Sequence, residues 1–131
     1  MRIVLWLACA ITVAYWVIWY AGDRDWLASL HTPEYYAFEN AFPAADGWLA
    51  FGYAAAAVTL GRRSGTFWLI AAGSASLYLS SMDILFDLQH DVYAPGGGAV
   101  AAEIAINVAT LALGVWLLRA GWRAVTGSAS R

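Results

Sequence analysis

The sequence contains no lysine and one cysteine, Cys9. A lone cysteine forms neither an intrachain disulfide nor a cysteine metal cluster, so thiol redox chemistry within the chain is excluded. The basic residues are all arginines, and they form no basic stripe. The glycine run Gly96–Gly98 follows Pro95 as a turn and lacks the pattern of a phosphate-binding loop. We therefore expect neither nucleic acid nor a nucleotide as a partner.

Charged residues are also scarce, at 12% of the chain, whereas hydrophobic residues make up 62%. The hydrophobic residues are concentrated in four apolar stretches, Ile3–Tyr20, Ala44–Leu60, Thr66–Phe86 and Ala99–Leu118. Each is close to the roughly 20 residues that an α-helix needs to cross a bilayer. The stretches carry almost no charge, unlike the helices of a water-soluble bundle. The sequence therefore predicts an all-α integral membrane protein, residues 1–131 forming one domain with four transmembrane helices.

The arginines are distributed unevenly between the connections of this predicted bundle. Only Arg24 lies in a connection after an odd-numbered helix. The others lie before the first helix, between the second and third, and after the fourth: Arg2, Arg62, Arg63, Arg119, Arg123 and Arg131. The positive-inside rule then predicts that both termini are cytoplasmic. We place the protein in the inner (cell) membrane of a bacterium.

The first outer connection contains a helix signal of its own. Thr32 followed by Pro33 is typical of a helix N-cap and first turn. The segment 33–42 mixes aromatic residues with Glu34 and Glu39, a composition that suits a short helix at the membrane interface. Such a helix would cover the outer end of the bundle or serve as an aromatic anchor, and the sequence favours neither.

Small and polar residues recur on one face of each predicted transmembrane helix. On the third helix, spacings of three and four align Ala72, Ser76, Ser80, Asp83, Asp87 and His90. The other helices carry Glu103, Asn107, Thr110 and Gly114; Asp46, Ala50, Tyr53 and Ala57; and Cys9, Thr12, Trp16 and Trp19. In lipid, small residues mark helix contacts and polar residues point inward. These faces should form the bundle interior, most polar at the outer end.

The acidic residues at that outer end need an explanation. Asp83 and Asp87 lie one turn apart near the C-terminus of a helix, where the helix dipole disfavours negative charge. An aspartate at the membrane centre costs about 2.5–3.5 kcal/mol on insertion scales. The outer side offers only Arg24, His31 and His90 against nine acidic residues. Some of the carboxyl groups should therefore be protonated, bound to a metal, or solvated.

Acid–base catalysis on a hydrophobic small molecule or membrane lipid is the function that we favour. Asp83 and Glu103 would be the acid and base, with Asp87 as the third catalytic residue. Substrate contacts are expected from Tyr53, Asn107, His90, Glu39, Trp16 and Trp19. A carboxylic acid and a carboxylate in an aromatic pocket suit an isomerase, a cyclase or an epoxide-opening hydrolase, because ring faces stabilise a carbocation. No cofactor is required.

Three alternatives remain open. A non-catalytic membrane subunit or ligand-binding module would use the acidic residues only as solvated helix ends. A divalent cation held by Asp83, Asp87, His90 and Glu103 would suit an enzyme acting on a lipid diphosphate. A proton-coupled carrier would use an intramembrane acid to couple transport. In each case a second copy of the chain or a partner membrane subunit could complete the site.

Overall fold

The computed structural model describes residues 1–128, and within this range all regular structure is helical. The elements in chain order are α1 (Arg2–Ala21), the 3-10 turn η1 (Arg24–Trp26), α2 (Pro33–Glu39), α3 (Pro43–Thr59), α4 (Arg63–Gln89) and α5 (Gly98–Ser128). The prediction of an all-helical protein is confirmed. Arg131, which entered the topology argument, lies outside the described residues.

Three helices, α1, α4 and α5, are long and apolar enough to cross a membrane. The helix α3 has 17 residues, at the short end of the range for a membrane span. The largest boundary difference is in α5, which was predicted to end at Leu118 and continues to Ser128. Arg119 ends the apolar run, but charge does not end a helix, and no proline follows.

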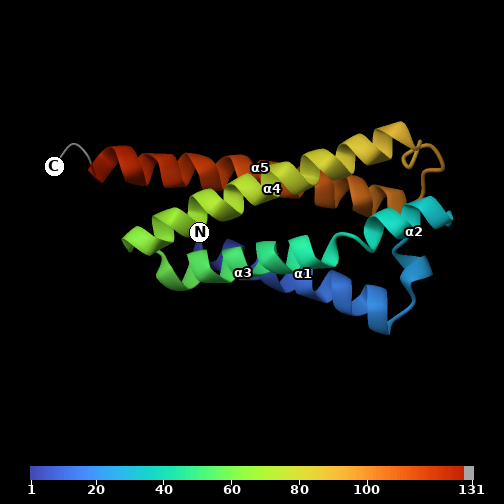
Figure 1. Ribbon diagram of the computed structural model, residues 1–131, viewed down its shortest axis with the longest axis horizontal. Coiled ribbons are helices and arrows are strands. Elements are labelled where there is room, and N and C mark those ends of the chain that lie inside the picture. The colour runs from blue at the N-terminus through green and yellow to red at the C-terminus, as the bar shows by residue number, and fades with distance from the viewer. Residues whose placement is uncertain (129–131) are drawn as a thin grey trace.

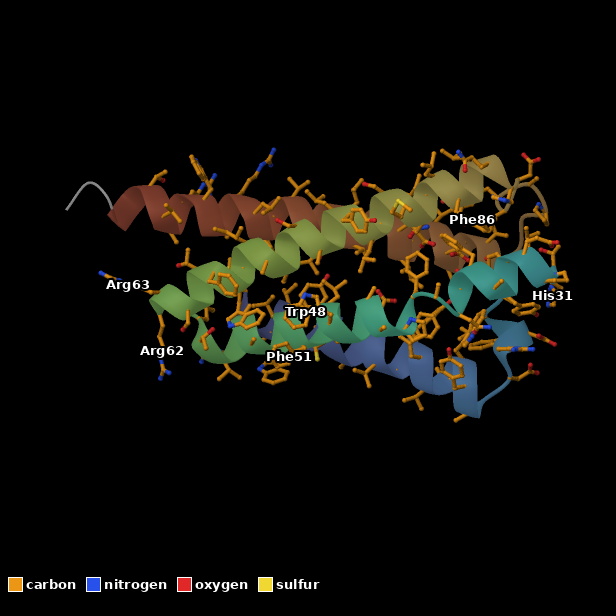
Figure 2. The ribbon with its side chains drawn as sticks, viewed as in Figure 1. His31, Trp48, Phe51, Arg62, Arg63 and Phe86 are labelled. Atoms are coloured by element: carbon orange, nitrogen blue, oxygen red, sulfur yellow. The ribbon has the colours of Figure 1, made fainter. Side chains whose placement is uncertain are left out.

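The long helices form a row in chain order (Figure 1). The helix α1 packs on α3, α3 on α4, and α4 on α5, whereas α1 and α5 form no contact of comparable extent in the described part of the chain. Figure 1 shows η1, α2 and the α4–α5 connection at one end, which we call the lid end. Arg62 and Arg63 lie at the opposite end, the arginine end, while His31 lies at the lid end (Figure 2).

Glycines bring α4 and α5 close together. A Cβ atom added to Gly73 would lie 2.9 Å from the backbone nitrogen of Leu118 and 3.0 Å from the carbonyl oxygen of Gly114. A Cβ on Gly114 would in turn lie 3.0 Å from the carbonyl oxygen of Gly73. Small residues of this kind allow helix backbones to approach closely in a membrane. This contact fixes one side of the bundle.

Two apolar clusters close the ends of the bundle. The arginine-end cluster joins residues from all four long helices: Leu5, Leu49, Tyr53, Ala56, Ala57, Leu69, Ala72 and Leu117. The lid-end cluster joins α1, the lid segment (residues 24–42) and the α4–α5 connection: Trp19, Ala28, Tyr35 and Val92. Between the two clusters the helices surround the polar residues of the site.

The outward surface is apolar. On α1, Ile3, Ile11 and Val17 are 75%, 62% and 57% exposed, and similar side chains cover the outer faces of α4 and α5, among them Phe67, Tyr78, Leu85 and Val108. Contiguous apolar surface of this extent is rare on soluble monomers. The surface agrees with the length and composition of the helices in indicating a membrane protein.

The glycine contact predicts how one methyl group affects stability. Gly73→Ala places a Cβ against two backbone atoms of α5, and overpacking of this kind costs about 1–3 kcal/mol. Gly47→Ala is the matched control, because Gly47 is helical with no atom within 4 Å of the added Cβ. We expect Gly73→Ala to lower the free energy of unfolding in mixed micelles and Gly47→Ala to leave it unchanged or raise it. Equal effects would contradict the close α4–α5 packing.

Candidate functional site

A cavity of about 920 Å³ lies between α1 and α5, bounded on its other sides by α3, α4 and the lid segment. It is lined from Val4 to Trp16 on α1 and from Gly98 to Leu113 on α5, a length of roughly 20 Å at 1.5 Å per residue. Most of the lining is apolar, and the polar side chains gather toward the lid end. The cavity therefore has the shape and polarity of a site for an elongated, largely apolar molecule.

Three carboxyl groups converge in the lining of this cavity. Glu39 at the end of α2, Asp83 on α4 and Glu103 on α5 bring carboxylate oxygens within 4.8 Å of one another. Glu39 and Glu103 are 5% and 8% exposed. The sequence predicted that Asp83 and Glu103 would face each other from adjacent helices, and the structure places them together. Glu39 joins them because the lid segment folds back over the bundle.

Glu103 is the best-partnered of the three carboxyl groups. Its Oε2 accepts hydrogen bonds from the Ser29 hydroxyl at 2.7 Å and the Tyr35 hydroxyl at 2.8 Å. Burial, with the nearby carboxylates of Glu39 and Glu103, raises the pKa of Tyr35 well above its ordinary value, so this phenol keeps its proton and remains a donor. Both hydroxyl groups donate to the same oxygen of the carboxyl group. They also tie the lid segment to α5.

Glu39 is weakly partnered. Among the described residues its one hydrogen-bond donor is the Tyr15 hydroxyl, at 3.3 Å from Oε2, which is longer than the usual 2.5–3.0 Å for this type of bond. Burial, followed by the negative charges of Glu103 and Asp83, raises the pKa of Glu39 to about 9. Glu39 is therefore protonated at neutral pH and can act as a proton donor.

The remaining polar lining comes from α1, α3 and α5. Trp16 donates from Nε1 to Oδ2 of Asp46 at 2.9 Å. The Tyr53 hydroxyl lies 2.7 Å from the Ser76 hydroxyl, and Asn107 is buried beside the carboxyl cluster. Trp16, Tyr53 and Asn107, all predicted substrate contacts, thus line the cavity. Asp46, which the sequence places on the inward face of the second predicted helix, lines it too.

Three predicted site residues lie outside the cavity lining. Asp87 is fully buried behind Asn107, whose Nδ2 donates to its Oδ2 at 3.0 Å. His90 follows the last residue of α4, and its exposed ring stacks on Phe86. Trp19 belongs to the lid-end cluster and donates from Nε1 to Asn40 at 3.0 Å. The proposed cation group of Asp83, Asp87, His90 and Glu103 is thus replaced by Glu39, Asp83 and Glu103 as the set that could share one ion.

The sequence did not predict the residues that donate hydrogen bonds to Glu39 and Glu103. Ser29 and Tyr35 belong to the lid segment and Tyr15 lies one position from Trp16, so none stands on a predicted polar face. The N-cap signal was the available clue. The Thr32 hydroxyl does accept a hydrogen bond from the Tyr35 backbone nitrogen, which fixes the start of α2 and with it the position of Tyr35.

The chemistry open to the site is proton exchange among three carboxyl groups or binding of a positive charge. Like charges this close cannot all ionise unless a cation is bound. Aromatic side chains from several elements border the same space: Tyr15, Trp16, Trp26, Phe42 and Tyr53. Comparison of the chain with protein-family models, curated proteins and solved structures finds no match.

The Tyr35–Glu103 hydrogen bond predicts the stability of the lid. Tyr35→Phe leaves a buried carboxyl group with one donor fewer, a loss of about 1–3 kcal/mol. Tyr36→Phe is the control, because the Tyr36 hydroxyl bonds Asp25 at an exposed position. We expect limited proteolysis of residues 22–32 to be faster in Tyr35→Phe and unchanged in Tyr36→Phe. Equal rates would show that the hydroxyl does not hold the lid segment.

The raised pKa of Glu39 predicts how stability varies with pH. A carboxyl group whose pKa is higher in the folded protein stabilises the fold at low pH, and this contribution is lost as pH rises toward the folded value of about 9. Glu39→Gln removes the titrating group and keeps the shape. We expect the unfolding midpoint to fall less between about pH 5 and pH 9 in this variant than in the wild type. If the unfolding midpoints of the variant and the wild type fell in parallel with pH, the raised pKa of Glu39 would be contradicted.

Proposed function

We propose that all four long helices cross the membrane, with both termini and the α3–α4 turn in the cytoplasm of a bacterial cell. The positions of Arg62 and Arg63, at the end opposite His31, support this orientation (Figure 2). The length of α3, 17 residues, suffices for a span. The carboxyl cluster then lies near the outer face of the membrane.

We propose that the cavity binds a hydrophobic small molecule or lipid and performs acid–base chemistry on it. The single observation that carries this proposal is the meeting of three carboxyl groups at the polar end of a long apolar cavity. A structural role alone gives no reason to gather these groups around space large enough for a ligand. Burial of a carboxyl group is costly, and a site with perturbed acids in such a pocket is typical of catalysis.

The substrate reaches the cavity from the lipid. Leu7 and Ile11 of α1 and Ile106 of α5 line the cavity and are 56%, 62% and 43% exposed. The lining is therefore continuous with the outer apolar surface between α1 and α5. A membrane-dissolved molecule enters along this side without crossing water.

The proton steps follow from the different environments of the carboxyl groups. Glu39 holds a proton at neutral pH and is the proposed acid, whereas Glu103, which accepts hydrogen bonds from Ser29 and Tyr35, is the proposed base. Delivery of a proton to one carbon of an alkene leaves a cation on the other alkene carbon, and removal of a proton from the next carbon along the chain forms the shifted double bond with no net change in protons. Asp83, within reach of both glutamates, passes the proton between them. Aromatic ring faces stabilise the intermediate cation.

A divalent cation is the second candidate, because three carboxylate oxygens within 4.8 Å could share one ion. Oxygen ligands suit Mg²⁺. An ion would neutralise the cluster and turn the site toward a phosphate-bearing lipid. The cavity lining in the described residues supplies no arginine to bind that phosphate, so acid–base chemistry is the better-supported function.

Removal of the carboxyl groups tests the proposal. We expect Asp83→Asn and Glu103→Gln each to abolish turnover of the bound molecule, with loss by a factor of at least about 10² for a general acid or base. Neither should unfold the protein, and Asp83→Asn should raise its thermal stability because it relieves the like-charge repulsion within the carboxyl cluster. Native mass spectrometry from mild detergent identifies the ligand, and extracts incubated with the protein reveal its product.

Asp91→Asn is the matched control, since Asp91 is exposed and asparagine tolerates its positive φ of 54°. A ligand retained unchanged by wild type and variants would support a binding module in place of an enzyme. Mass that corresponds to Mg²⁺ and disappears in the variants would favour the metal site. Large loss of folded protein in both variants would favour a structural role for the carboxyl groups.

A further inference from the structure

The charge of the cavity lining restricts the ligand. It contains the carboxyl groups of Glu39, Asp46, Asp83 and Glu103 and, among the described residues, no arginine or histidine. The nearest lid arginine, Arg24, lies over the Tyr36 ring at 4.7 Å from its centroid. An anionic head group would therefore meet only like charges and apolar surface. The polar end of the ligand must be positive or a hydrogen-bond donor.

Two carboxyl groups at the polar end of the cavity can accept further hydrogen bonds. Glu39, 5% exposed, has within the described part of the chain only the long contact from Tyr15. Glu103, 8% exposed, receives both of its hydrogen bonds on Oε2, which leaves Oε1 without a donor in the described part of the chain. Among the described residues the buried side-chain atom without a partner is Oδ1 of Asp87, so Oε1 of Glu103 is not enclosed by protein and can accept a hydrogen bond from a bound donor. Glu39 and Glu103 both belong to the cavity lining, so a ligand can supply such a donor.

The shape of the cavity restricts the rest of the molecule. From Glu103 to Leu113 the α5 lining extends about 15 Å away from the carboxyl cluster. The α5 wall along this length is formed by alanine and isoleucine together with Asn107 and Thr110. The arginine-end cluster, with Leu5 and Leu117 fully buried, closes the far end. One extended apolar chain fills this space.

We propose that the site takes a single-chain amphiphile with a protonated amine head, which donates hydrogen bonds to Glu39, Asp83 and Glu103 while its chain lies along α1 and α5. This inference rests on the proposed function, because it specifies the ligand of the same cavity. A positive charge that forms on an apolar substrate during catalysis would occupy the same position. The amine is thus either the natural head group or a mimic of that charge.

The test compares head groups on one chain. Wild-type protein in phosphatidylcholine nanodiscs is titrated with dodecylamine, dodecanol and dodecanoate at pH 7, and displacement of a fluorescent alkylamine is measured. We expect dodecylamine to bind at least about ten-fold more tightly than dodecanoate, because a charge pair is formed in one case and repulsion in the other. Glu39 is protonated in the empty site, and a bound ammonium group favours its ionised form. Glu39→Gln, which cannot ionise, should therefore weaken amine binding and leave dodecanol binding unchanged.

A second pair of variants tests the cavity without changing its charge. Ala102→Trp fills the lining, whereas Ala101→Trp, also exposed on α5, adds the same ring outside it. We expect only Ala102→Trp to abolish amine binding. Dodecanoate binding as tightly as dodecylamine would overturn the head-group inference and leave the proposed catalytic site standing. Amine binding unaffected by both Glu39→Gln and Ala102→Trp would show that the amine binds elsewhere and overturn the inference.

If Mn²⁺ binds and displaces the amine probe, the cluster holds a metal, and the inference is overturned in favour of the second candidate function. If the natural ligand found by mass spectrometry is uncharged yet is displaced by dodecylamine, the amine acts as a mimic, as the inference allows. Turnover by a wild-type protein that binds no amine would contradict the inference alone. A wild-type protein that shows neither turnover nor amine binding would contradict the proposed function as well.

Discussion

The meeting of three carboxyl groups, two of them buried, with no arginine or histidine among the described lining residues, is the constraint on which the lid end of this protein depends. Each buried charge is costly unless it is paired or protonated. The structure meets this cost with hydroxyl donors: Tyr35 and Ser29 for Glu103, and Tyr15 for Glu39. Because two of these donors belong to residues 24–42, the position of the lid segment and the protonation of the cluster are linked. Any ligand that changes the charge of the cluster therefore changes the forces on the lid.

The cavity exists because the two sides of the helix row pack differently. Gly73 and Gly114 let α4 and α5 approach so closely that a Cβ atom on either glycine would press against the backbone of the other helix. The side of α1 that faces the cavity offers no glycine and presents Val4, Leu7 and Ile11. Close helix contact in lipid needs small residues on both partners. The first and last helices of the row therefore remain apart between the two apolar clusters, and the space between them is the site.

Apolar length and residue spacing were sufficient to predict the long helices and the meeting of Asp83 with Glu103, because both depend on local periodicity. Spacing did not predict that Asp83 lines the cavity and Asp87 does not. Four residues turn a helix by about 400°, and the extra ~40° takes Asp87 out of the cavity lining. His90 was placed on the same face, but α4 ends at Gln89. Glu39 and Tyr35 reach the site through the path of an irregular connection, which no period describes.

The arrangement of the two clusters bears on the choice between catalysis and transport. A carrier must open its binding site to each side of the membrane in turn. Here the arginine-end cluster unites residues of all four long helices, and Leu5 and Leu117 are inaccessible within it. To open this end, α1 or α5 would have to expose several buried apolar side chains and break the hydrogen bond from Arg2 to the Ala57 carbonyl. The lid end is closed by the lid-end cluster and by the hydrogen bonds from Ser29 and Tyr35 to Glu103. A cavity that is closed at both ends and borders the lipid between α1 and α5 is suited to a ligand that enters from the membrane, reacts and returns to the same membrane.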